Sequence, residues 1–290
     1  MKLWILSTPV PASEDTSYLI GRTASRSAQV FISRVPPDAP DPPPPPEADI
    51  DIILNRSFIP RRDFLLKLDR IAAERGVLLT NPGTASARAC DKRSYLEDFP
   101  DLAPRSGIAR SVEDVLAYQE AWGGNVVLKD PLGKHGKDII LFRGARDRKA
   151  ASDLLSRMDQ GEVVAQEFCS GFIAGDKRII LHRDRKHGFK PAAWFKRVPK
   201  AGEWKSNVSA GGRIERCELE NQEVHLAKEV AERAGLDSIG IDLEWPEDRC
   251  PLIEANAYAD EPAPVDNDRR VHSGDDFAAM ICHLAKAGRP

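Results

Sequence analysis

Two carboxylates and an amide occur near the carboxyl end of the chain. They are Asp242, Glu254 and Asn256, in two alternating apolar stretches, 238–245 and 251–258, separated by a Pro-Glu-Asp-Arg turn. This pattern predicts two strands joined by a tight turn. Side chains two apart share a strand face, so Asp242 can face Glu254 and Asn256. Such oxygen ligands suit Mg²⁺ bound with phosphate oxygens, although ordinary solvent-facing acids on a hairpin are the simpler interpretation.

A glycine-containing loop, residues 131–137, lies between two predicted strands and carries Lys134 and Lys137. Its glycines would let backbone N–H groups approach phosphates, and its lysines would neutralise their charge. The P-loop pattern is absent, and for the segment taken alone a hairpin with surface lysines is the better interpretation. Lys129, in the apolar strand before the loop, either faces solvent or points at an anion.

Three arginines are further candidates, because guanidinium forks suit carboxylates and phosphoryl groups. Arg178 follows Asp176, Arg197 lies on a predicted strand, and Arg213 follows two glycines. Each alone fits a surface residue, but their placement favours a shared site. The six histidines show no metal-ligand spacing, and no Gly-x-Ser-x-Gly is present, so neither zinc nor a nucleophile elbow is predicted.

The elements that must position these residues alternate between strand and helix. A strand at 3–6, a strand at 50–54, a helix around 64–72 and a strand at 77–80 predict a parallel α/β unit. The stretch 15–30 is ambiguous, with a helix possible over its middle. Proline dominates residues 36–46, which predicts a stiff surface connection or an SH3-type ligand.

The rest of the chain continues this mixture. Ser111 and Asp114 predict a capped helix that ends at Gly123. Residues 206–215 show no clear secondary structure. The other expected elements are strands at 125–130, 138–142 and 163–168, an antiparallel pair at 178–182 and 189–198, and helices at 148–158, 221–234 and around 277–284.

The bulk composition limits the class of protein. The net charge of −3 over 290 residues gives no general attraction to nucleic acid or membrane. The five cysteines are scattered without a Cys-x-x-Cys pair, which favours a reducing compartment. No apolar run is long enough for a signal peptide or a membrane span. We therefore expect a cytoplasmic protein that binds neither nucleic acid nor membrane.

The order of these segments resembles the ATP-grasp superfamily, in particular bacterial glutathione synthetase, and is also similar to RimK-type amino-acid ligases. The resemblance covers about residues 49–260. The segments that carry it are D-I-I-L-N-R (51–56), N-P-G-T-A-S-A-R-A-C-D-K (81–92), V-V-L-K-D-P-L-G-K-H-G (126–136), A-Q-E-F (165–168), G-D-K-R-I-I (175–180), F-K-R-V-P (195–199), N-V-S-A-G-G-R (207–213) and G-I-D-L with E-A-N (240–256).

The resemblance implies an α/β (α+β) chain with the ATP-grasp fold, in which two α+β subdomains clasp ATP after a small N-terminal α/β domain. The expected boundaries are 1–85 for the N-terminal pre-ATP-grasp domain, 86–168 for the lid subdomain and 169–290 for the core that holds Mg²⁺ and substrate. Two departures concern the substrate. The N-terminal part is shorter than in the family, and Lys134 and His135 stand where the family favours small residues.

The resemblance also implies roles for individual residues. Two Mg²⁺ ions, or Mn²⁺ in their place, would bind to Asp242, Glu254 and Asn256. The acceptor and its developing charge would be held by Arg178, Arg197, Arg213 and Asn207. The residues expected to bind ATP are Lys92, Lys129, Gly133, Lys134, Gly136, Gln166, Glu167, Phe168 and Asp176.

The implied activity is that of an ATP-dependent carboxylate–amine ligase acting through an acyl phosphate. Its substrates would be amino acids or short peptides, and the resemblance leaves a homo-oligomer open. Two alternatives remain at this point. One is an ATP-grasp kinase that phosphorylates a small substrate without ligation, and the other is a non-catalytic nucleotide-binding protein that interacts with a partner.

Overall fold

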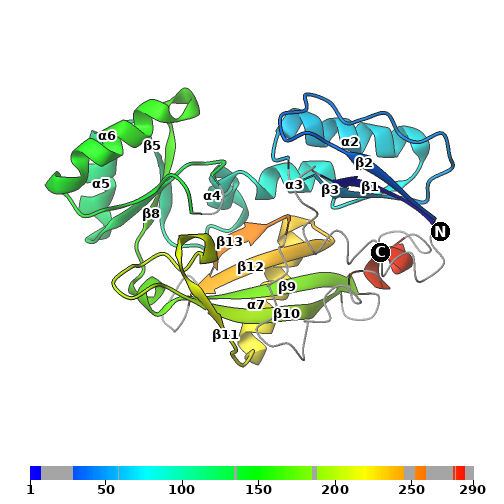
Figure 1. The fold of residues 1–290 in the computed structure, drawn as a ribbon. Coiled ribbons are helices and arrows are strands. Elements are labelled where there is room, and N and C mark those ends of the chain that lie inside the picture. The colour runs from blue at the N-terminus through cyan, green and yellow to red at the C-terminus, as the bar shows by residue number, and fades with distance from the viewer. Residues whose placement is uncertain are drawn as a thin grey trace.

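The computed structural model contains three sheets, arranged along the chain as an N-terminal parallel sheet and two antiparallel sheets (Figure 1). The residues it describes are 1–7, 29–57, 59–133, 136–184, 188–244, 252–258, 277 and 279–284. The ambiguous stretch at 15–30 lies outside them, except for its last two residues.

The N-terminal sheet has the strand order β2-β1-β3-β4 and is parallel throughout. Its strands are β1 (Lys2–Ser7), β2 (Gln29–Arg34), β3 (Ile52–Arg56) and β4 (Leu78–Thr80). Helix α2 (Arg62–Arg75) connects β3 to β4 and ends at Gly76, whose φ of 64° is in the left-handed region. The predicted parallel unit is confirmed. Strand β2 was not predicted, because its sequence lacks clear alternation.

The proline-rich segment is bound to the surface of α2. Arg61 donates to the carbonyl of Ala39, and Arg75 donates to the carbonyls of Pro46 and Ala48. Every third residue, Asp41, Pro44 and Glu47, is exposed, which is the period of a polyproline helix, and the prolines between them are partly buried. This arrangement favours a stiff surface connection over an exposed ligand segment.

The middle sheet is antiparallel, with the order β5-β8-β6-β7. Its strands are β5 (Ser106–Ala109), β6 (Val126–Lys129), β7 (Ile139–Phe142) and β8 (Val163–Glu167). Helices α5 (Val112–Trp122) and α6 (Arg148–Arg157) share one apolar core with this sheet (Figure 1). The predicted capping box of Ser111 and Asp114 is present, and Gly123 ends α5 with a φ of 70°.

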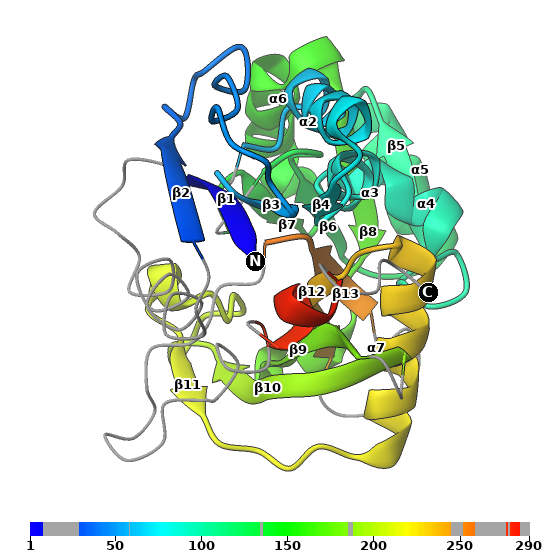
Figure 2. The same ribbon diagram turned by 90° about the vertical axis from the view of Figure 1, so that its right-hand side faces the viewer.

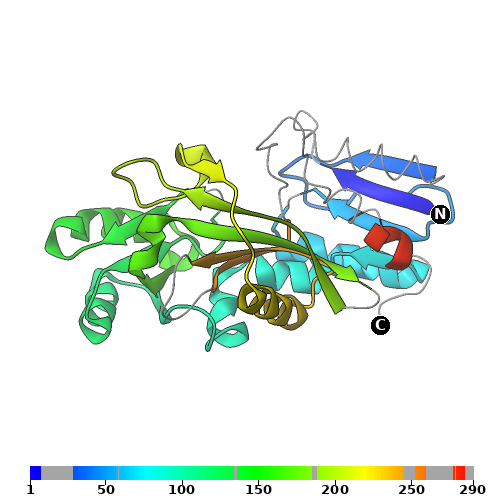
Figure 3. The ribbon, with the colours of Figure 1, turned by 90° about the horizontal axis from the view of Figure 1, so that it is seen from below.

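The third sheet is also antiparallel, with the order β11-β10-β9-β12-β13. Its strands are β9 (Asp176–Asp184), β10 (Gly188–Val198), β11 (Arg213–Glu215), β12 (Ser238–Glu244) and β13 (Leu252–Asn256). Helix α7 (Asn221–Ala234) lies across one face, as Figure 3 shows in dark yellow. Both predicted hairpins are confirmed. The expectation of no clear secondary structure at 206–215 is wrong at two places: Val208–Ala210 form a 3₁₀ turn, and β11 pairs with β10.

Short helical elements connect the first two sheets and contact the third. They are α3 (Gly83–Ala89), the 3₁₀ turn Lys92–Ser94 and α4 (Tyr95–Asp98). Tyr95, Phe99 and Ala103 lie in the core that α7 shares with the third sheet. These residues follow the boundary expected at position 86, and their side chains belong to the core of the third sheet.

Hydrogen bonds fasten the carboxyl edge of the N-terminal sheet to the third sheet. Asn81 donates to the carbonyls of Ser238 and Ala257 at 2.7 Å and accepts from the N–H groups of Asp237 and Ser238. The C-terminal helical residues, red in Figure 2, pack on the N-terminal sheet through Phe277, Met280, Ile281 and Leu284. No helix in the described part of the chain is long and apolar enough to cross a membrane.

Candidate active site

The third sheet has one face covered by α7 and one face that carries charge. On the charged face, Asp242 pairs in register with Arg178 on β9 and with Glu254 on β13. Arg197 pairs with Asp176, two positions along the same face. Directly opposed residues of antiparallel strands point to the same side, so register alone brings these charges together. The apolar residues Ile179, Leu181 and Ile241 lie on the other face, in the core with α7.

Asp242 belongs to a row of four charged side chains of alternating sign, in the order Arg178, Asp242, Arg197 and Asp176. Nε and Nη2 of Arg178 donate to its two oxygens at 2.6 and 2.8 Å, and Nη2 of Arg197 contacts Oδ2 at 2.8 Å. Burial raises the pKa of Asp242, but the two guanidinium groups outweigh it and hold the pKa at about 2. Asp242 is only 1% exposed, so it is a buried carboxylate kept ionised by its partners.

Asp176 is the last side chain in this row of charges. Arg197 Nε donates to Asp176 Oδ1 at 2.9 Å, and a second, shorter contact joins Nη2 to Oδ2. Sequence analysis predicts that Asp176 binds the nucleotide, but in the structure its carboxylate holds Arg197. Gly175 allows this approach, because a Cβ there would lie 2.2 Å from the carbonyl oxygen of Arg197 and the φ of Gly175 is 103°.

Glu254 and Asn256 complete the expected oxygen ligands. Glu254 is partly open, with 30% of its side chain exposed, and Nδ2 of Asn256 is buried without a hydrogen-bond partner among the described residues. A carboxylate has about four lone-pair positions that can accept hydrogen bonds or bind a metal. Arg178 and Arg197 occupy three of these positions on Asp242, which leaves about one. The set can therefore hold Mg²⁺ if phosphate and water oxygens supply the remaining ligands. The described residues contain no cluster of three or more His, Cys, Asp or Glu that would hold a metal alone.

Tyr95 holds this pair of ligands, and sequence analysis did not identify it. Its hydroxyl donates to the carbonyl of Ala255 at 2.8 Å and accepts from the Ala255 N–H at 2.7 Å. Strand β13 is an edge strand, so its outward backbone groups need such partners. Tyr95 thereby fixes the backbone of Ala255, the residue between Glu254 and Asn256. The only available signal was its position one helical turn after Lys92.

Lys92 connects the charged face to the glycine-containing loop. Its Nζ lies 3.4 Å from Glu254 and donates to the carbonyl of Gly133 at 2.5 Å. Its backbone N–H donates to the carbonyl of Pro131 at 2.9 Å. The predicted cation is thus placed between the carboxylates and the loop. Lys134 lies outside the described residues.

Lys129 is buried inside the middle sheet and does not face solvent. Its Nζ donates to Oε1 of Gln166 at 2.6 Å, and Gln166 donates in turn to Ser106. Burial lowers the pKa of Lys129 to about 8, with Glu254 opposing and Lys92 adding to this effect. The structure therefore excludes the solvent-facing interpretation of Lys129.

Glu167 and Phe168, both expected to bind ATP, lie at the end of β8. The N–H groups of Glu167 and Phe168 donate to the carbonyls of Arg105 and Asn125, at 2.8 and 3.0 Å. A backbone contact from these two residues to a base would therefore use their carbonyls. Phe168 also meets Trp204 edge to face, with ring centroids 6.0 Å apart. Sequence analysis did not identify Trp204.

Asn207 lies against the other side of the glycine-containing loop. A Cβ at Gly136 would lie 2.5 Å from Asn207 Oδ1, and the φ of Gly136 is 70°, so only glycine fits this approach easily. Lys205 donates to the Gly136 carbonyl at 3.4 Å. The structure thus brings together two predicted residues, Gly136 and Asn207, and adds Lys205.

Arg213 is not brought to the cluster. It pairs in register with Val198, whereas Arg197 pairs with Ile214, so Arg213 points to the opposite side of the sheet. Its side chain is 66% exposed and donates to Glu215 at 2.6 Å. Arg213 is therefore paired one position away from Arg197, and this difference of one residue places it on the face opposite to the other two arginines.

Comparison with known proteins identifies the family of the chain. Residues 92–244 match the family model described as prokaryotic glutathione synthetase, ATP-grasp domain. Glutathione synthetase of Bordetella parapertussis is 31% identical over 177 residues, which cover 59% of this chain and 54% of that protein. The chain thus spans little more than half the length of this relative.

Solved structures show the same fold over nearly the whole chain. A RimK domain ATP-grasp protein from Sphaerobacter thermophilus superposes with a TM-score of 0.70 at 16% identity, covering 97% of this chain and all of that one. D-Alanine–D-alanine ligase from Bacillus anthracis gives 0.68 at 11% identity, covering 99% of both. The fold is ATP-grasp, and the chain belongs to the family of prokaryotic glutathione synthetase ATP-grasp domains.

Proposed function

We propose that the protein is an ATP-dependent, ADP-forming carboxylate–amine ligase whose substrates are amino acids or short peptides. One observation carries the proposal. The charged sheet face presents three carboxylates and two arginines, and Lys92 joins that face to a glycine-containing loop. This arrangement combines oxygen ligands for Mg²⁺ with cations for phosphoryl groups, as phosphoryl transfer requires.

The reaction begins when a substrate carboxylate oxygen attacks the γ-phosphorus of ATP. The bond to the bridging oxygen breaks, and ADP leaves. An amine then attacks the carbonyl carbon of the acyl phosphate, phosphate leaves with the bonding pair, and the amine loses a proton. When bound, Mg²⁺ on Asp242, Glu254 and Asn256 supplies charge neutralisation for the phosphates.

The protein's own groups position the reactants and offset their charge. Lys92 and Lys129 would contact the phosphates, and the loop around Gly133 and Gly136 would cover them. Arg178 and Arg197 are held rigidly by Asp242 and Asp176, so their remaining N–H groups can meet the acceptor carboxylate without reorganisation. Exclusion of water by the loop would protect the acyl phosphate from hydrolysis.

Lys129 predicts a specific pH dependence of ATP binding. Its pKa of about 8 means that it loses its proton, and its attraction for phosphate, as pH rises through that value. ATP affinity should fall by up to about tenfold per pH unit above 8, since one proton is linked to binding. Titration of ATP from pH 6.5 to 9.5 measures this. Lys129→Met should bind more weakly but with no slope near pH 8, and an equal slope in that variant would contradict the assignment.

The function itself is tested by ADP release. Purified protein with MgATP is given pools of amino acids and short peptides, with and without hydroxylamine, which traps acyl phosphates as hydroxamates. ADP together with hydroxamate supports carboxylate activation, and addition of amines then identifies the product. ADP with a stable phosphorylated product and no hydroxamate would favour the kinase alternative. ATP binding without ADP from any pool would favour a non-catalytic protein.

A further inference from the structure

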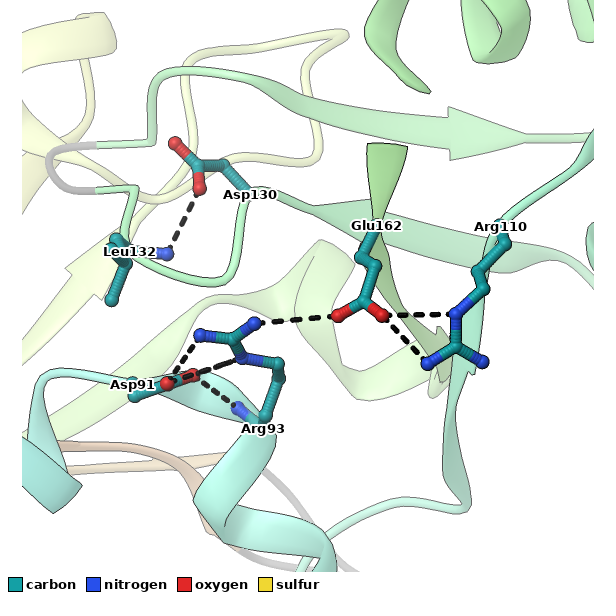
Figure 4. A network of polar contacts seen from close by, with 6 residues as sticks. All are labelled: Asp91, Arg93, Arg110, Asp130, Leu132 and Glu162. Carbon is teal, nitrogen blue, oxygen red and sulfur yellow. Dashed lines mark hydrogen bonds and ion pairs between the residues drawn. The ribbon is translucent and has the colours of Figure 1, made fainter. Parts of the chain in front are cut away.

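A network of ion pairs lies between the middle sheet and the short helical segment that carries Lys92 (Figure 4). Arg93 makes a fork with Asp91, with Nε to Oδ1 at 2.9 Å and Nη2 to Oδ2 at 2.7 Å. Its remaining nitrogen, Nη1, donates to Glu162 Oε2 at 3.3 Å. Arg110 donates twice to the other oxygen of Glu162, at 2.9 and 2.6 Å.

The network joins different parts of the fold. Asp91 and Arg93 belong to the connection before α4, whereas Glu162 precedes β8 and Arg110 follows β5. Hydrogen bonds from Arg110 and Arg93 lower the pKa of Glu162, so its carboxylate stays ionised. Only 12% of the Glu162 side chain is exposed. The Glu162 carboxylate is therefore shielded, whereas 35% of the Arg93 side chain and 65% of the Arg110 side chain are exposed.

Lys92 lies between Asp91 and Arg93 in the chain. Its backbone N–H bonds to Pro131 and its side chain to Gly133, in the same loop whose first turn is closed by the Leu132 N–H on Asp130 Oδ1 (Figure 4). Three residues on, Tyr95 binds the Ala255 peptide of β13. The segment 91–95 is thus held on one side by the middle sheet and on the other by the third sheet.

We propose that Arg93 is a positioning residue, and that its bridge to Glu162 fixes Lys92 against the loop 131–133. This inference rests on the proposed function, because Lys92 matters through its contact with ATP. The guanidinium of Arg93 contacts Asp91 and Glu162, so Arg93 would act on the nucleotide through Lys92. Loss of the bridge leaves Lys92 itself, through Pro131 and Gly133, to hold the segment to the middle sheet, with Tyr95 as the anchor to the third sheet.

The test uses the full chain with Arg93→Gln, Glu162→Gln and the double variant. The first readout is hydrogen exchange of the Lys92 N–H in the absence of nucleotide, because that group bonds to Pro131 across the joint. Each single variant should speed this exchange about tenfold while amides in β12 keep their rate. The second readout is the Kd for MgATP, which should rise about five- to tenfold, with no further rise in the double variant.

Glu113→Gln is the matched control. Glu113 also pairs with an arginine in the same unit, Arg148 at 3.2 Å, but this pair joins α5 to α6 and does not contact segment 91–95. It should leave both readouts unchanged. Unchanged exchange at Lys92 in both single variants would overturn the proposal, as would faster exchange with an unchanged Kd. If wild-type protein binds no ATP, the proposed function fails, and the exchange rates still decide whether Arg93 holds Lys92.

Discussion

Glu254→Gln is expected to lower ADP formation by at least about 100-fold while the protein keeps its fold. The change removes one of two carboxylate charges from the proposed Mg²⁺ site and the anionic partner of Lys92 at 3.4 Å. Loss of a supporting hydrogen bond around a metal typically costs 10- to 100-fold, and loss of a direct ligand should cost at least as much. The measurement is ADP release against Mg²⁺ concentration, with circular dichroism as a check on folding.

Glu229→Gln is the control for this variant. Glu229 lies on α7, behind the same sheet, and pairs only locally with Arg233. It should change neither the rate nor the Mg²⁺ requirement. A Glu254→Gln enzyme with a normal rate would remove Glu254 from the metal site. A rate that recovers fully at high Mg²⁺ would show that Glu254 contributes affinity and not transition-state stabilisation.

Hairpins and helix ends depend mainly on residues close together in the chain, and such features can be predicted from the sequence. The hairpin of β12 and β13 follows from alternation on either side of a turn. Helices α2, α5 and α7 end at Gly76, Gly123 and Gly235, each in the left-handed region that an L side chain rarely adopts. The order of strands is different, because pairing of β2 beside β1 depends on contacts distant in sequence.

The site shows the same division. The residue types of Asp242, Glu254 and Arg178 left ordinary surface charges as the simpler interpretation, and only the resemblance to the ATP-grasp superfamily made a shared site the expectation. Strand register places the three side chains side by side. Register itself was not predictable. It pairs Arg197 with Asp176, and it turns Arg213 to the opposite face, because a shift of one residue reverses the direction of a side chain.

Positioning residues were the hardest to predict. Tyr95 and Arg93 have no motif that marks them, and each acts through a partner more than 60 positions away in the chain. Their contacts exist only because the middle and third sheets both meet the segment 91–95. Sequence similarity to a family identifies residues that contact the ligand, whereas the residues that hold them depend on the packing of this chain.

Asp242→Asn is expected to abolish ADP formation and also to destabilise the fold by about 3 kcal/mol, unlike Glu254→Gln. Asp242 is the shared anion of Arg178 and Arg197, and removal of one partner from a buried ion pair leaves uncompensated charge. Arg197 keeps Asp176, so the cost falls mainly on Arg178. Urea denaturation at pH 7 measures the loss. An additional Arg178→Met should recover part of the stability without restoring activity. An Asp242→Asn protein as stable as wild type would show that this series of ion pairs is not essential to the fold.

The pKa of Asp242, about 2, predicts a second difference between the variant and the wild type. The stabilisation from Asp242 is complete above its ordinary pKa of 3.8 and is lost as pH falls toward 2, so this acid dependence should be weaker in the variant.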